Sequence, residues 1–530
     1  MISALAEPDG STAKQIARNI TDNNCWAISL SVLIMLFTAS SCFFSNRLAQ
    51  RVIRVLSALL WTAAIALPLL FVGYWLSHQA LFSSDVLVAL WQTDPAEAFE
   101  YVSYKGSALS SVLLVSAVIL CVISVRTLTC RQTLKGYNRM IPMATVIMLM
   151  AAIYSSVKTG GGNATLDVFR TTVAKIEELD SFKHQLEHRK VLIASLDSIK
   201  HQGRPGLFVV IIGESQTRDR MSAYGYERET TPWLSSKRHD QHFVLMENSY
   251  SCYPQTVQAL GQALTSHSQF SSQSLAESPS IVEIANAAGY EVIWLSNQNR
   301  LGNWDTPTTV IANQAGLQVW LNSNIGKKIQ SQHFDDALLW ELAKIPSAQD
   351  KKSLVFLHVL GCHSDYRQRY PSSFDIWRDD TGAYDNAVRF SDDFTRRVYE
   401  LVKDRPDFQA LVFMSDHGEY PTIGHTTDPF KWSMVRIPLW AAFSNSFEES
   451  ASETVRSFAA NANKPFTNDM FFDMICGLLD IKNHPYYEKR NDPASSDFNR
   501  PVEMLSTVSG KFRIVDDPNL SSPLQPTSSP

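Results

Sequence analysis

Nearly all long apolar runs lie before residue 158 of this chain of 530 residues. Four of them approach the roughly 20 residues that a helix needs to cross the hydrocarbon core of a bilayer. They are residues 26–44, 55–76, 108–125 and 141–157. A cleaved signal peptide followed by buried core helices would not contain several such runs. The sequence therefore predicts a membrane domain of about four spans over residues 1–158.

The basic residues of this region predict its orientation. Positive charges are enriched in loops on the cytoplasmic side of a membrane. One basic group follows the first run and another separates the third run from the fourth: Arg47, Arg51, Arg54, Arg126, Arg131, Lys135 and Arg139. Both loops are expected in the cytoplasm, which places the segment after the fourth run outside it. Residues 85–104 mix acidic with aromatic and aliphatic side chains, which is typical of a helix in the membrane interface.

Charge and cysteine content exclude two classes of protein. The net charge of -5 is small, and Lys and Arg gather near the apolar runs, so no nucleic-acid partner is expected. Only Cys252, Cys362 and Cys476 follow the membrane region, too few for a dense disulfide scaffold. A bridge between Cys252 and Cys362 and a pair of buried free thiols both fit the sequence.

The remainder of the chain has the pattern of an α/β domain. Residues 159–205 form a charged connector, in which residues 168–201 carry apolar residues at helical spacing. Strand-length apolar runs then alternate with helical stretches: the runs are 207–212, 291–296, 354–360 and 410–415, and the helices are 281–288, 335–345 and 384–403. This alternation predicts a central, mostly parallel sheet with helices on both faces, over residues 206–510. Residues 511–530 are expected to form a flexible tail.

Polar clusters follow each of the four predicted strands. Their sequences are GES (213–215), SNQ (296–298), GCH (361–363) and SDHGE (415–419). The carboxyl ends of parallel strands lie at one edge of a sheet, where such folds bind their ligands. We therefore expect one site built from all four clusters rather than four unrelated turns.

The residue types in these clusters predict a zinc site. Asp416 and His417 offer an oxygen and a nitrogen ligand on one turn, and Glu214 adds a second carboxylate, which leaves one position open. A hydroxyl in that position would lose its proton far more readily than in water. Thr256 is the candidate, because a helical pattern begins there and helix amides favour a phosphate. From its position alone, Thr256 could equally be an ordinary helix cap.

Six segments resemble, in order, the motifs of membrane-bound phosphoethanolamine transferases of the alkaline phosphatase and sulfatase superfamily. They are VVIIGESQTR (209–218), YGYERETTP (224–232), WLSNQ (294–298), HVLGCH (358–363), YDNA (384–387) and SDHGE (415–419). The resemblance covers about residues 207–444 and implies a sulfatase-like α/β domain. It also implies that Thr256 is the nucleophile and that zinc is bound by Glu214, Thr256, Asp416 and His417.

The resemblance extends to two further histidines and to the reaction. It implies that His363 and His425 bind the phosphate, act as acid or base, or belong to a second metal site; the alternative is that they are structural. The implied reaction moves phosphoethanolamine from phosphatidylethanolamine to lipopolysaccharide or another envelope glycan through a covalent threonine intermediate. The implied location is a bacterial inner membrane, with several spans and a periplasmic catalytic domain.

The chain departs from the family pattern in several places. Members usually have five spans, many carry several disulfides around the site, and Cys362 stands where serine is common. Residues 416–425 form a shorter segment than in members that modify lipid A. Residues 254–260 are nearer to members that modify the lipopolysaccharide core. The acceptor therefore stays open between a core sugar, lipid A and a periplasmic glucan.

Three other functions share parts of this pattern. Cys252 and Pro254 match the start of the sulfatase Cys-x-Pro-x-Arg motif, but Thr256 occupies its arginine position. A glycerophosphate transferase of the same superfamily would carry the same four ligands, although segment 224–232 favours the ethanolamine branch. A non-catalytic scaffold would have no need to keep every proposed ligand.

Overall fold

The computed structural model describes residues 34, 46–53, 55–60, 62, 84–92, 118–119, 121–122, 164–298, 307–322, 333–427 and 429–520. The chain forms two compact units, Met1–Ile176 and Glu177–Pro530. In the first unit, α3 (Ser84–Gln92) coincides with the start of the helix expected over residues 85–104. Most residues of the four predicted spans lie outside the described ranges. Within those ranges no helix has the length and hydropathy that crossing a bilayer requires.

The connector predicted as helical consists of α7 (Ala164–His184), α8 (Leu186–Ala194) and η3 (Asp197–His201). A buried ion pair attaches α8 to α11 (Ile281–Ala287). The Arg189 guanidinium is 1% exposed, and its Nε donates to Glu283 Oε1 at 3.2 Å. A buried charge is strongly destabilising unless it is paired, so this contact fixes α8 against α11 within the second unit.

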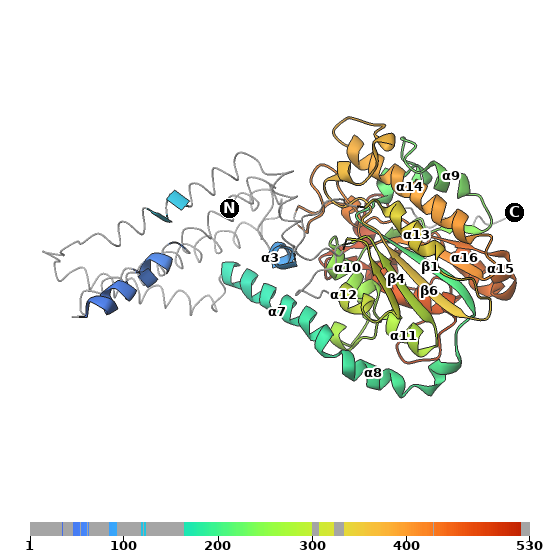
Figure 1. Ribbon diagram of the computed structural model, residues 1–530, viewed down its shortest axis with the longest axis horizontal. Helices are drawn as coiled ribbons and strands as arrows, with labels where there is room; N and C mark the ends of the chain where they lie inside the picture. The colour runs from blue at the N-terminus through green and yellow to red at the C-terminus, as the bar shows by residue number, and fades with distance from the viewer. Residues whose placement is uncertain are drawn as a thin grey trace. The chain divides into compact units, whose positions relative to one another are not determined.

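A seven-stranded sheet forms the centre of the second unit, in the order β2-β8-β7-β1-β6-β4-β5 (Figure 1). Its strands are β1 (Gly206–Gly213), β2 (Phe243–Leu245), β4 (Glu291–Ser296), β5 (Leu317–Trp320), β6 (Lys352–His358), β7 (Phe408–Ser415) and β8 (Leu439–Phe443). Neighbours from β7 to β5 are parallel, and β8 is antiparallel to both β7 and β2. The prediction of a mostly parallel sheet is confirmed.

Helices cover both faces of this sheet. One face carries α9 (Pro232–Lys237), α13 (Leu338–Ala343) and α14 (Gly382–Val402), and α11 lies on the other (Figure 1). Every residue of β1 is buried. Val209 and Ile211 of β1 share a core with Leu342 of α13 and Phe394 of α14. Each such side chain contributes roughly 1.5–3 kcal/mol on burial, so the core holds the strand ends in fixed positions.

One strand is displaced by two residues toward the N-terminus from its predicted position at residues 354–360. β6 ends at His358 rather than at residue 360. The amides of Leu360 and Gly361 donate to the carboxylate of Asp335 at 2.8 and 2.9 Å, instead of pairing with a neighbouring strand. The chain therefore leaves the sheet two residues early.

The flexible tail expected from residue 511 is also corrected. Residues 511–520 include β11 (Phe512–Arg513) and η13 (Ile514–Asp516). Asp517 accepts a hydrogen bond from Tyr250 Oη at 2.8 Å and pairs with the Arg436 guanidinium. This buried contact anchors the segment to the domain. Residues 521–530 lie outside the described ranges.

Candidate metal-centred active site

Hydrogen bonds join the ends of β1 and β7 around two buried carboxylates, Glu214 and Asp416. The amide of Asp416 donates to Gly213 O at 3.0 Å, and the amide of Ser215 donates to Asp416 Oδ1 at 3.0 Å. Ser215 has a φ of 55°, which is uncommon outside glycine. This turn brings its hydroxyl to Glu214 Oε1, to which it donates at 2.8 Å.

Four side chains meet at this edge of the sheet. His417 Nε2 lies 3.5 Å from Glu214 Oε1 and 3.4 Å from Asp416 Oδ2. Thr256 Oγ1 lies 3.2 Å from His417 Nε2 and 3.4 Å from Glu214 Oε2. Ligand atoms about 2.0–2.1 Å from a tetrahedral zinc are roughly 3.3 Å apart. The spacing of these groups therefore fits zinc, and the structure brings together the four candidate ligands named from the sequence.

The unpartnered polar atoms of the group also fit a cation. Asp416 Oδ2 is buried and has no hydrogen-bond partner. His417 Nδ1 is 2.8 Å from Gly418 O, so we assign its proton to Nδ1, which leaves the Nε2 lone pair facing the other ligands. Burial, together with the nearby Asp416 carboxylate, raises the pKa of Glu214 well above its usual value. Burial lowers the pKa of His417. Two buried carboxylates beside a neutral imidazole favour a divalent cation.

Thr256 is the first residue of α10 (Thr256–Ala263), as the sequence predicts. Its hydroxyl stands at a helix N-terminus, where free backbone amides favour an anionic group. Asn468 holds the loop that precedes it. The Asn468 side-chain amide donates to Asp416 O at 2.8 Å and to Ser251 Oγ at 3.1 Å. Its oxygen accepts from the amide of Cys252 at 2.8 Å.

The two further histidines named from the sequence lie beside this group. His425 Nδ1 is 2.7 Å from Glu419 Oε2, and its ring centroid is 4.3 Å from that of His417. Tyr366 Oη donates to the other Glu419 oxygen at 2.9 Å. Ligand atoms of His417, Glu419 and His425 lie within 4.8 Å of one another. Burial, with added repulsion from nearby cationic groups, lowers the pKa of His363 to about 3, so its ring is neutral.

The bridge considered between Cys252 and Cys362 is absent, and both thiols are free. Cys252 belongs to an apolar cluster with Ala259 and Val508, whereas Cys362 packs in a different cluster that includes Tyr384. Burial raises the pKa of both thiols well above the usual value. Protonated, buried thiols are unreactive, so the two cysteines are packing residues.

Three buried polar residues of this region were missed by the sequence analysis. Asn468 and Asp335 each begin a short 3-10 helix distant in sequence from the motifs, and no local signal marks them. His358 lies within a quoted motif but received no role. Its ring packs edge-on against Trp294 at 5.7 Å between centroids, and neither ring nitrogen has a hydrogen-bond partner. Burial lowers its pKa to about 4.

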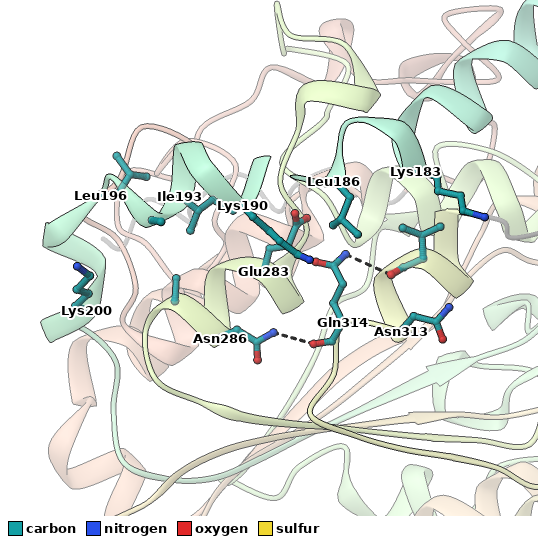
Figure 2. Close-up of a pocket in the computed structure, with 13 residues that line it drawn as sticks. Lys183, Leu186, Lys190, Ile193, Leu196, Lys200, Glu283, Asn286, Asn313 and Gln314 are labelled. Carbon is teal, nitrogen blue, oxygen red and sulfur yellow. Dashed lines mark hydrogen bonds between the residues drawn. The ribbon is translucent and has the colours of Figure 1, made fainter. Parts of the chain in front are cut away.

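A separate pocket of about 660 Å³ lies between α8, α11 and α12 (Pro307–Ala312) (Figure 2). Lys183 and Lys200 lie at opposite sides of it, with Lys190 between them. Among the described residues that line it, the only acid is Glu283, which pairs with Arg189. None of the candidate ligands or histidines lines this pocket. The strand ends, and not the pocket, therefore form the candidate active site.

The fold and the site together define a class of enzyme. A mostly parallel sheet covered on both faces, with carboxylates, an imidazole and a threonine hydroxyl at its strand ends, is the arrangement of the alkaline phosphatase and sulfatase superfamily. The profile of the Sulfatase family matches residues 207–481. The chain belongs to this family.

Named relatives share a large part of the sequence. Phosphoethanolamine transferase EptC of Escherichia coli (strain K12) is 27% identical over 414 residues, which are 70% of each chain. Kdo(2)-lipid A phosphoethanolamine 7''-transferase of the same strain is 30% identical over 305 residues, which are 51% of each chain.

Solved structures share the fold. The C-terminal periplasmic domain of EcEptC from Escherichia coli, in complex with Zn, has a TM-score of 0.54 and 24% identity, and the match covers 60% of this chain and 94% of that one. The integral membrane protein EptA of Neisseria meningitidis, a lipooligosaccharide phosphoethanolamine transferase, has a TM-score of 0.62 and 17% identity. That match covers 88% of this chain and 97% of that one.

Proposed function

We propose that this protein transfers phosphoethanolamine from phosphatidylethanolamine to lipopolysaccharide or another envelope glycan. One observation carries the proposal. The Thr256 hydroxyl stands at the N-terminus of α10, 3.2 Å from His417 Nε2 and 3.4 Å from Glu214 Oε2. A nucleophile in that position can meet both a cation and the helix amides that bind phosphate oxygens. Relatives named phosphoethanolamine transferases support the choice of the transferred group.

The proposed zinc ligands are Glu214, Thr256, Asp416 and His417. The zinc complex of the EptC domain supports this choice of metal. Zinc bound here would lower the pKa of the threonine hydroxyl and offset charge on a phosphoryl oxygen. The chain orients the ligands itself. Ser215 and Gln298 donate to the two Glu214 carboxylate oxygens at 2.8 and 3.2 Å, and the Gly418 carbonyl fixes the His417 ring.

The proposed reaction has two steps at one phosphorus atom. In the first, Thr256 Oγ1 forms a bond to phosphorus, the bond to the glycerol oxygen breaks, and the threonine proton ends on the released diacylglycerol. A phosphoethanolamine ester of Thr256 is the intermediate. In the second, an acceptor hydroxyl forms the new bond to phosphorus, the bond between phosphorus and Thr256 Oγ1 breaks, and the acceptor proton restores the Thr256 hydroxyl. Such reactions depend mainly on positioning and charge stabilisation.

We propose that His363 and His425 assist these steps. The neutral ring of His363 can donate an N–H to a phosphate oxygen without adding a fixed charge. The Glu419 carboxylate holds the His425 ring in one orientation, as a group that accepts and returns a proton requires. Tyr366 in turn fixes Glu419. A second metal at His417, Glu419 and His425 is the alternative use of the same residues.

The donor lipid suggests where the protein works. We propose that residues 1–158 anchor the chain in a bacterial inner membrane and that the second unit faces the periplasm. The four apolar runs support an anchor, and the Neisseria relative is an integral membrane protein. A site held there would meet phospholipid headgroups directly. A core sugar, lipid A and a periplasmic glucan remain the candidate acceptors.

A sulfatase reaction at Cys252 receives less support from the geometry. The Cys252 thiol is buried beside Ala259 and Val508, whereas the hydroxyl of Thr256 faces the proposed ligands. A glycerophosphate transferase would use the same four ligands as our proposal. It therefore stays the alternative, and it differs only in the donor headgroup.

The nucleophile is tested by trapping the intermediate. With phosphatidylethanolamine supplied and no acceptor, peptide mass spectrometry should show one phosphoethanolamine on Thr256. Thr256→Ala should abolish the adduct and Cys252→Ala should keep it. An adduct on Cys252 would favour sulfatase-like chemistry, and full transfer by Thr256→Ala would remove the nucleophile assignment. Phosphatidylglycerol supplied in parallel tests the alternative, since a glycerophosphate adduct formed instead would replace the proposed donor.

A further inference from the structure

Asp335 lies where the loops after two neighbouring strands meet. Its carboxylate is 5% exposed and accepts three hydrogen bonds. Two come from the amides of Leu360 and Gly361, which follow β6, at 2.8 and 2.9 Å. The third comes from Asn297 Nδ2, which follows β4, at 2.8 Å. Asp335 itself starts η7 (Asp335–Ala337), so one buried side chain outside the sheet joins the carboxyl ends of two of its strands.

The first loop fixes the main chain of Glu214. Gly361 has a φ of +52°, and a Cβ at this position would lie only 2.8 Å from Glu214 O. The amide of Cys362 donates to Glu214 O at 2.9 Å. Any displacement of the loop away from Asp335 therefore breaks a main-chain contact to the proposed zinc ligand.

The second loop fixes the carboxylate of Glu214. Asn297, which is bonded to Asp335, directly precedes Gln298. Gln298 Nε2 donates to Glu214 Oε2 at 3.2 Å and to Val359 O at 2.8 Å. The Asp335 carboxylate is thus connected to the backbone of Glu214 through the loop after β6. It is connected to the side chain of Glu214 through Asn297 and Gln298.

We infer that Asp335 is a positioning residue, which holds Glu214 in the geometry that the proposed metal centre needs. The inference rests on the proposed function only in taking Glu214 as a zinc ligand. Asp335 contacts neither that ligand nor the reacting groups. Residues that orient a ligand in this way commonly change metal affinity by about 10–100-fold when they are replaced.

Two other aspartates of the chain separate positioning from simple stability. Asp392 is also buried and accepts from two main-chain amides, those of Trp233 at 2.9 Å and Leu234 at 3.1 Å, but these belong to α9 and not to a strand-end loop. Asp336, next to Asp335, is partly exposed and pairs with Arg397 at 3.2 Å. Replacing Asp335, Asp392 or Asp336 by Asn makes the same chemical change in three different environments.

The experiment measures the zinc affinity of the full chain in detergent, by competition with a chromophoric chelator below the onset of unfolding. Asp335→Asn should weaken zinc binding about 10-fold or more. Asp392→Asn should lower the unfolding temperature and keep the parent affinity, and Asp336→Asn should keep both. Folded Asp335→Asn protein with the parent affinity would overturn the inference, and so would an equal loss of affinity in Asp392→Asn.

Gln298→Ala keeps the test decisive if Asp335→Asn does not fold. Gln298 is partly exposed and tests only the connection to the Glu214 side chain, so weaker zinc binding supports the inference and unchanged binding contradicts it. Failure of the proposed function is visible separately, as a parent protein that binds zinc but transfers no phosphoethanolamine. In that case the affinity measurements still decide the role of Asp335. A parent protein that binds no zinc would contradict both the proposed function and the inference about Asp335.

Discussion

At the scale of single residues, the two carboxylate oxygens of Asp416 have different partners. Its Oδ1 accepts from the amides of Ser215 at 3.0 Å and His417 at 2.6 Å. Its Oδ2 is buried without a partner. The first oxygen fixes the side chain, and the second is left for a cation. Burying a carboxylate oxygen without a partner is strongly unfavourable. Substitution of Asp416 is therefore a sensitive test of metal binding.

Replacing Asp416 tests this assignment. The folded parent should contain about one tightly held zinc per chain, since a structural or catalytic zinc uses four ligand positions. Asp416→Ala should lose it, as measured by metal analysis after dialysis. Glu419→Gln is the control, because Glu419 bonds to His425 and lies outside the proposed ligand set. Zinc content equal to the parent in folded Asp416→Ala would exclude Asp416 as a ligand.

The sequence indicates candidate ligands more readily than it indicates the residues that support them. Asp416 and Glu214 could be named because each follows a strand whose apolar run is plain in the sequence. Thr256 could be named because a helical pattern begins there. Asp335 and Asn468 could not, because their partners are backbone groups of loops far away in the chain. Nearly every residue has a backbone amide and carbonyl, so the sequence does not show which of these groups a distant side chain will bind.

At the scale of elements, the long buried strands were predictable and the short strands were not. β1, β4 and β7 were found because burial on both faces requires continuous apolar runs. β2, β5 and β8 have three, four and five residues, and short apolar stretches of that length also occur in loops and helices. The helices α11 and α14 were predicted within about two residues of their observed ends.

The helix α17 (Phe471–Leu479) should make stability depend on pH. Burial raises the pKa of Asp473 to about 8 and that of Asp492 to about 7. It does so although Asp473 accepts hydrogen bonds from Asn491 and from the Glu488 amide, and Asp492 accepts one from Tyr487. A carboxyl with a raised pKa is protonated in the folded chain and ionised in the unfolded one. Its stabilising contribution is therefore complete below about pH 4 and is lost as pH rises toward its folded pKa.

We expect the free energy of unfolding to fall by more than about 1 kcal/mol between pH 6 and pH 8. Thermal or urea unfolding of the second unit across this range measures the slope. Asp473→Asn should reduce the slope, because it removes one proton bound only by the folded chain. A slope that is identical in the parent and in Asp473→Asn would show that Asp473 is ionised in the fold.

At the scale of the whole molecule, the charge pattern of the first 158 residues makes the location of the site testable. Basic loops remain in the cytoplasm, so a reporter that is active only in the periplasm should be active when fused after Val157. The same reporter fused near Arg131 should be silent. The opposite result would overturn the predicted spans and place the second unit on the wrong side of the membrane for the proposed acceptors.

The segment around Asp517 has a consequence for how the protein is made. The amide of Val508 donates to Cys252 O at 2.9 Å, and Asp517 binds Tyr250, 267 positions earlier in the chain. The loop that carries Thr256 is thus supported by residues that are synthesised well after it. A chain translated only as far as Thr256 would contain Glu214 and Thr256 but would lack these supports. The candidate active site would therefore form only after Asp517 has been synthesised.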